Sequence, residues 1–202
     1  MATRTMSKKI KALLAGGLVL GVGGTVVLAA WTDSEFSEGI FSAGSLNLEG
    51  SGDGTTYADQ DTVDGALQLT FSDLFDNLAP EDTTYAAYWL RLDAPTTTDA
   101  TLTPTSVTAT DITETNADAI SWTLTQVDSG DCEAGTAVGT VVASGSTLDE
   151  LTGATTLDLT ANAAGTPGTA VPLCFAVTAG AEGTFEQAGQ TSAVWQFDAT
   201  SV

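Results

Sequence analysis

Residues 84–92 read Thr-Tyr-Ala-Ala-Tyr-Trp-Leu-Arg-Leu, and this stretch decides the fold class. Its aromatic and branched side chains are typical of a central β-strand. A second run, residues 120–127, alternates in the same way, with Ile120, Trp122, Leu124 and Gln126 on one face. Because alternate residues of a strand point to the same side, both runs predict strands with one buried face.

Working outward, further short runs repeat this pattern between clusters of Gly, Asp, Pro and Ser. They are residues 46–48, 66–71, 101–110, 138–143, 171–178 and 193–199. Eight or nine short strands separated by turn signals predict an all-β fold, an antiparallel β-sandwich. We expect one or two short helical turns, at residues 72–78 and 149–151, and a surface loop at residues 161–168.

The N-terminus has the pattern of a secretory signal peptide. Basic residues precede a 19-residue apolar run, residues 12–30, which ends in Ala29 and Ala30 just before a polar, acidic stretch. We expect cleavage between Ala30 and Trp31, which makes 1–30 a removed signal peptide and 31–202 a single secreted domain. The alternative is an uncut membrane anchor, since the run is about long enough to cross a bilayer.

Removal of the leader makes the chain strongly acidic. All 26 acidic residues and only one basic residue, Arg91, follow Ala30, so the mature formal charge is −25. Such a surface repels phosphate backbones and anionic lipid, which excludes nucleic acid as a partner. The simplest role of this charge is solubility outside the cell.

Two cysteines remain after cleavage, Cys132 and Cys174. In an exported chain, such a pair predicts one disulfide. A metal site built on two thiolates is the alternative, although no histidine or third cysteine is present to complete it.

The residues needed for most hydrolytic chemistry are absent. The chain has no histidine, and no lysine follows the leader, which excludes Ser-His-Asp, Cys-His and Ser-Lys catalysis. Two carboxylates suffice for glycoside hydrolysis, but no pair stands out. We therefore expect no catalytic residues and no enzyme activity.

Calcium is the one cofactor that the acidic residues suggest. Asp53, Asp59, Asp61 and Asp64 fall close together, but Val63 interrupts the EF-hand spacing. A second cluster beside the first cysteine comprises Asp128, Asp131 and Glu133. We expect solvated loops between strands to explain both clusters better than a specific calcium site, so no metal ligand is assigned.

The aromatic residues divide into two groups. Trp89, Trp122 and Trp195 lie in alternating runs, and we expect them in the core rather than on a sugar-stacking platform. Four bulky residues instead lie on the N-terminal segment 31–43: Trp31, Phe36, Ile40 and Phe41. They need burial, either as the first strand of this sandwich or in a neighbouring subunit.

The N-terminal region also resembles one family. Residues 29–36 (AAWTDSEF) and 41–48 (FSAGSLNL), after a basic and apolar leader, are similar to exported proteins of the TasA/camelysin group, as found in actinobacteria. The resemblance implies a SipW-type signal peptidase as partner, cleaving between Ala30 and Trp31. It also implies a jelly-roll-like sandwich, with 41–48 opening the first core strand.

In that group, the N-terminal segment of one subunit completes the sheet of the next in matrix fibres. Camelysin-type members are described as metallopeptidases, but this chain has no His-Glu-x-x-His motif, so we do not carry that activity over. We expect a secreted or cell-wall-associated subunit of the extracellular matrix or biofilm that self-assembles by donation of segment 31–43. The alternative is a monomeric secreted module that binds calcium or a glycan.

Overall fold

The computed structural model describes residues 11–14, 34–40, 43–72, 78–128, 132, 137–163 and 165–202. Within these, residues 43–202 form one compact unit. Its elements are β1 (Leu48–Ser51), η1 (Val63–Gly65), β2 (Thr83–Leu92), β3 (Ala100–Thr113), η2 (Ala117–Ala119), β4 (Ile120–Val127), β5 (Gly139–Gly145), β6 (Leu157–Leu159), β7 (Val171–Ala179) and β8 (Gln190–Ser201). The elements η1 and η2 are single 3-10 turns, so the fold is all-β, as predicted.

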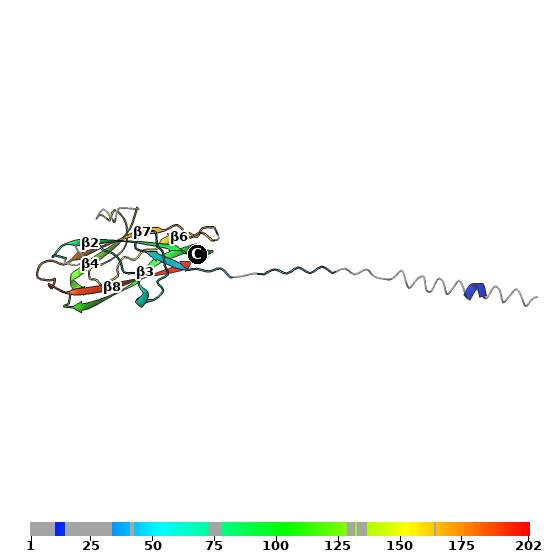
Figure 1. Ribbon diagram of the computed structural model, residues 1–202, viewed down its shortest axis with the longest axis horizontal. Coiled ribbons are helices and arrows are strands. Elements are labelled where there is room, and N and C mark those ends of the chain that lie inside the picture. Colours follow the sequence, from blue (N-terminus) through cyan, green and yellow to red (C-terminus); the bar gives the residue numbers. More distant parts are fainter. Residues whose placement is uncertain are drawn as a thin grey trace, which may run out of the picture. The chain divides into compact units, whose positions relative to one another are not determined.

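The strands form two antiparallel sheets. One has the order β1-β2-β7-β4-β5, the other the order β6-β3-β8, in which β8 runs beside β3 (Figure 1). The pairs β2–β7, β3–β6 and β4–β5 are those of one long hairpin rolled into a jelly roll. Its fourth pair, β1 with β8, is missing, because β1 pairs with β2. The fold is therefore a jelly-roll-like sandwich in which no described strand occupies the position beside β8.

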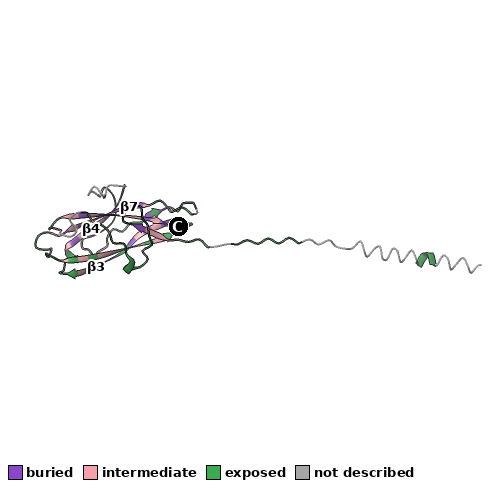
Figure 2. Cartoon of the chain, in the orientation of Figure 1, coloured by how far each residue is buried: buried purple, intermediate pink, exposed green. Residues whose placement is uncertain are grey.

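The core lies between the two sheets. In β4, Ile120, Trp122 and Leu124 are buried, which confirms the predicted inner face. Buried residues also line β7 (Figure 2). Its Phe175 contacts Trp122 of β4 and Trp195 of β8 at ring-centroid distances of 6.5 and 4.6 Å. Alternating apolar residues on both sheets thus exclude water from a single aromatic centre.

Most predicted strands are confirmed, with three differences. Residues 66–71 alternate like a strand but pair with no described strand, and the short β6 was not predicted. Residues 149–151 do not form a helical turn, because the Glu150 carboxylate binds Ser146 and closes a tight turn instead. The other helical turn was predicted at residues 72–78, of which 73–77 lie outside the described residues. The predicted loop at 161–168 is confirmed for the residues described.

One tryptophan lies on the opposite face from the one predicted. Trp122 is buried in the core and Trp195 packs against it, but Trp89 lies on the outer face of β2, opposite Pro172 and Ser51. In β2 the inward residues are Ala86, Tyr88 and Leu90, so the strand period places Trp89 outside. Its indole instead packs beside Gly54.

The predicted disulfide joins Cys132 to Cys174, with a Cα–Cα distance of 5.3 Å. Both cysteines are buried, in a small apolar cluster with Val127 on the outer face of the five-stranded sheet. Disulfides of this kind are typical of oxidising compartments. Among the described residues, no helix is long and apolar enough to cross a membrane.

Candidate functional site

The candidate site is the free edge of β8. This strand has 12 residues, and its only sheet partner is β3. Across the described part of the chain, no backbone–backbone hydrogen bond reaches its other side. A long edge strand with a row of unpaired N–H and C=O groups is a template for pairing with another strand.

The other sheet edges are short or covered. Gly50 of β1 exchanges backbone hydrogen bonds of 2.9 and 3.1 Å with Ala58, and Ser144 of β5 does the same with Thr152 at 3.0 and 2.7 Å. The remaining edge strand, β6, has three residues. Of the four edges, β8 is therefore the one that is both long and uncovered among the described residues.

The β8 edge also lacks the usual protection against pairing. Natural edge strands carry lysine, proline or bulges that discourage a partner. Residues 190–201 contain neither lysine nor proline, and their single charge is Asp198. Two bulges interrupt the pairing of β8 with β3, one opposite Gln196 and Phe197 in the middle of β8 and one at its start, but the extra residue of each lies on β3, and the run from Ser106 to Asp111 stays in register.

The inner face of β8 is incompletely covered. Trp195 and Phe197 are half-buried, although they contact the fully buried Phe175 at ring-centroid distances of 4.6 and 6.5 Å. The Trp195 Nε1–H group is buried without a hydrogen-bond partner among the described residues. Since an aromatic core next to an open strand position exposes apolar area, a further strand on this side would add burial.

The predicted assembly segment is described in part. In residues 34–40, Phe36 and Ile40 are 93% and 88% exposed, and no strand forms there. Ala30, Trp31 and Phe41, and with them the cleavage site, lie outside the described residues. Burial of this segment as the first strand of its own sandwich stays a prediction.

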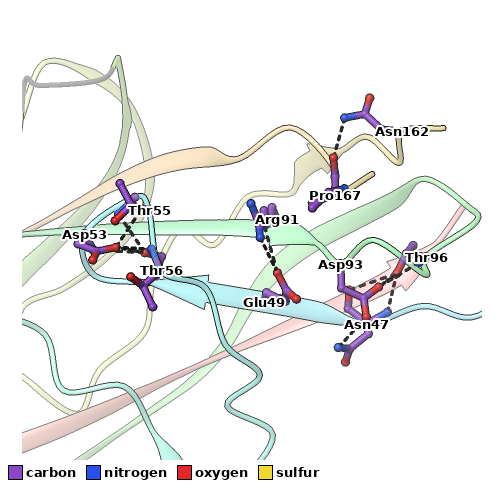
Figure 3. Close-up of polar contacts among 12 residues, drawn as sticks. Asn47, Glu49, Asp53, Thr55, Thr56, Arg91, Asp93, Thr96, Asn162 and Pro167 are labelled. Carbon is purple, nitrogen blue, oxygen red and sulfur yellow. Dashed lines mark hydrogen bonds and ion pairs between the residues drawn. The ribbon is translucent and has the colours of Figure 1, made fainter. Parts of the chain in front are cut away.

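The compact unit begins firmly just after this segment (Figure 3). The Ser45 hydroxyl donates to the Pro95 carbonyl at 2.7 Å, and the Asn47 side chain donates to the Asp93 carboxylate at 3.1 Å. Leu46 and Leu48 pack against the core, as expected for the phrase at 41–48. The residues that lead into β1 are therefore fixed to the compact unit by hydrogen bonds, whereas Phe36 and Ile40 in the preceding segment are exposed.

The first acidic cluster does not converge on a metal site. The Asp53 carboxylate accepts hydrogen bonds from the backbone N–H groups of Thr56 and Thr55 at 2.7 and 2.8 Å and from the Ser51 hydroxyl at 2.9 Å (Figure 3). These bonds hold the pKa of Asp53 far below its usual value and fix a tight turn. Among the described residues, no three acidic, Cys or His side chains lie close enough together to hold a metal ion.

The second cluster is described only at Asp128, which is exposed; Asp131 and Glu133 lie outside the described residues. Arg91, the one basic residue after residue 30 in the sequence, makes its contacts within the fold. Its guanidinium donates twice to Glu49, at 3.0 and 3.1 Å, and lies 3.6 Å from the centre of the Tyr57 ring. Arg91 therefore fastens the loop after β1 onto β2.

Comparison with known proteins adds no assignment: no protein-family model matches the chain, and a search of curated proteins finds no matching relative. The candidate site rests on the geometry alone. Sequence reasoning identified Phe36 and Ile40 but missed the β8 edge. Residues 190–201, with one charge and no proline, indicate a strand here, but they do not indicate that one of its edges is open.

Proposed function

We propose that this protein is a secreted structural subunit that self-assembles by strand donation, like the TasA/camelysin proteins that its N-terminus resembles. After cleavage behind Ala30, segment 31–43 of one copy adds to the β8 edge of another. The product is a fibre of the extracellular matrix, because each subunit carries one donor segment and one acceptor edge.

The observation that carries this proposal is the open strand position beside β8. A head-to-tail fibre needs an acceptor that the subunit itself leaves unfilled, and β8 is long, uncovered among the described residues and backed by aromatic side chains. The exposed Phe36 and Ile40 supply apolar side chains for the donor. They are four residues apart and therefore share one face of an extended strand.

The lengths of donor and acceptor also agree. At roughly 3.3 Å per residue, segment 31–43 and the 12 residues of β8 each extend over about 40 Å. One donated strand is thus long enough to pair along the whole edge.

The test compares mature protein beginning at Trp31 with protein beginning at Ala43. We expect the longer chain to form fibres in electron microscopy and to elute as large species in size exclusion, while the shorter chain stays monomeric. A mature chain with Phe36→Ser and Ile40→Ser should also remain monomeric. The control is Val138→Ser, which removes an apolar residue of the compact unit that is also exposed, at 66%.

Folding of each variant is checked by near-UV circular dichroism. Identical monomeric behaviour of the Trp31 and Ala43 chains, at low and high salt and with calcium, would defeat the proposal.

A monomeric glycan-binding module is the second candidate, and the outward position of Trp89 favours it. Trp89 and Tyr57 lie on the outer side of β2 and its neighbouring loop, and aromatic faces there suit sugar rings. Binding on a glycan array that is lost in Trp89→Ala, by a protein that does not assemble, would support this function. Absence of glycan binding in the wild-type chain would remove it.

A further inference from the structure

Residues 66–72, which we call the strap, lie along the edge of β2 beyond the end of β1. Pairing with β1 covers β2 from Trp89 to Leu92. The strap continues along the same edge of β2: Leu67 lies near Gly52, and the Ser72 N–H donates to the Tyr85 carbonyl at 2.8 Å. In the strap, Leu69 and Phe71 pack against the core.

The strap borders the open strand position of the jelly roll: it lies at the edge of β2 in the five-stranded sheet, and the open position lies beside β8 in the facing sheet. Tyr88 on β2 contacts Phe197 on β8 at a ring-centroid distance of 5.8 Å, so β8 lies across the sandwich from β2 and β7. A strand added beside β8 therefore lies over β2. The side chains of Leu69 and Phe71 help to cover the core on the same side of the sandwich.

The strap is held by few bonds. Residues 67–71 form no backbone–backbone hydrogen bond to any described residue, although their alternation is that of a strand. Its hydrogen bonds to β2 are made at one end, by Ser72 with Thr84 and Tyr85. Segments with few buried contacts and few internal hydrogen bonds open at the lowest free energy.

We propose that the strap is an internal placeholder for the donated strand. In the monomer it covers the core beside β2, and it leaves when segment 31–43 of a second copy pairs along β8. The exchange adds a row of backbone hydrogen bonds between β8 and the donated strand, which the strap does not make. This inference rests on the proposed strand donation.

The side-chain patterns of strap and donor support the exchange. The strap places Leu69 and Phe71 against the core, whereas Leu67 is exposed, and the donor presents Phe36 and Ile40. Each pair combines one aromatic and one aliphatic residue, in reversed order along the chain. A donor running opposite to the strap would set similar groups over the same part of the core.

The decisive variant locks the strap in place. The Ser72 and Thr84 hydroxyl oxygens are 3.1 Å apart, so Ser72→Cys with Thr84→Cys allows a disulfide that ties the strap to β2. The opposite variant, Leu69→Ser with Phe71→Ser, loosens it. The matched control is Leu157→Ser on β6, which disturbs the core away from the strap.

Two measurements are made on mature chains beginning at Trp31: the rate of fibre growth by light scattering, and the affinity of the monomer for a labelled peptide of residues 31–43. Because only the open form binds the donor, locking should lower both by about tenfold, and loosening should raise both. A reductant should restore the locked chain, with reductant on the wild type as control.

Equal growth rates and peptide affinities in the locked, loosened and wild-type chains would overturn the placeholder but leave strand donation intact. A wild-type chain that neither grows nor binds the peptide would overturn both proposals. If the loosened variant does not fold, the locked variant alone decides.

Discussion

Strands β7 and β8 have similar alternating sequences but very different surroundings. In β7, which pairs with β2 on one side and β4 on the other, all five inward residues are buried, and Phe175 is 1% exposed. In β8, which pairs with β3 alone, the aromatic residues Trp195 and Phe197 stay half-buried. The burial of a strand therefore depends on its neighbours as much as on its own sequence.

Under the proposed function, this difference separates the part of the molecule that determines stability from the part that assembles. Strand β7 lies inside a sheet and carries a disulfide at Cys174, whereas β8 has one edge that no described strand covers. We expect changes on the β7 side to lower the free energy of unfolding strongly. Changes on the β8 side should cost less stability.

The largest effect is expected from truncating the central aromatic residue. Phe175→Ala should lower the free energy of unfolding by about 3–5 kcal/mol, since it opens a cavity in the closed part of the core. Phe197→Ala removes a half-buried ring of the same size and should cost less than half as much. Urea unfolding followed by tryptophan fluorescence measures both, and equal losses would break the distinction between the two strands.

The next effect concerns the disulfide. Replacing Cys132 and Cys174 by serine frees a loop with a sequence separation of 42 and should lower the free energy of unfolding by about 2–4 kcal/mol. Differential scanning calorimetry detects the loss. Because the bond lies on the outer face of the β7 sheet, the peptide of residues 31–43 should bind the folded variant as it binds the wild type. A loss of peptide binding in the folded variant would show that the β8 edge depends on the disulfide of the β7 sheet.

The two strands also show what a sequence pattern can predict. Residues 84–92, 120–127, 171–178 and 193–199 all form the strands expected, because alternation and β-propensity act locally. Neither property states how many neighbours a strand will have. The open edge of β8 therefore followed only from the topology.

The wrong predictions have the same origin. Residues 66–71 alternate like a strand, yet no described strand offers them a ladder, so they remain a strap. Trp89 was assigned to the core by its residue type, although the period of β2 places Ala86, Tyr88 and Leu90 inside. The three-residue β6 carries too little pattern to be detected. In the candidate site, the exposed Phe36 and Ile40 were predictable from composition and the acceptor edge was not.

A third prediction uses a residue that contacts both strands. Tyr88 on β2 lies 6.4 Å from Phe175 and 5.8 Å from Phe197 between ring centroids, and burial raises its pKa from 10.0 to about 12. A raised pKa favours the neutral phenol in the folded state. Its stabilisation is therefore complete below pH 10 and is lost as the pH rises toward 12.

The contribution of Tyr88 to this alkaline loss should be about 1.4 kcal/mol for each pH unit in that window. Tyr88→Phe cannot ionise, so its free energy of unfolding should fall less steeply as the pH rises through this window. The slope should correspond to up to one proton per molecule fewer than in the wild type. Urea unfolding at a series of pH values measures that slope. An unchanged slope in the variant would show that the phenol is open to water, and with it the region between β2 and β8.

The smallest effect is expected where β8 begins. The Asp111 carboxylate on β3 accepts hydrogen bonds from the Thr191 hydroxyl of β8 at 2.7 Å and from the Asn116 and Ala117 N–H groups at 3.1 and 3.0 Å. These bonds, that of Thr191 above all, hold the pKa of Asp111 below its ordinary 3.8. Their contribution is present above that value and disappears as the pH falls below it.

Asp111→Asn removes the charge and its titration, so the variant should melt slightly below the wild type at neutral pH, and the difference should close as the pH falls below 3.8. Thermal melts from pH 7 downward provide the measurement, with Asp198→Asn, an exposed carboxylate on β8, as the control. Because Asp111 ties only one end of β8 to β3, the loss should be far smaller than that of Phe175→Ala. A loss as large as that one would mean that β8 depends on its attachment to β3 as strongly as β7 depends on its two neighbours.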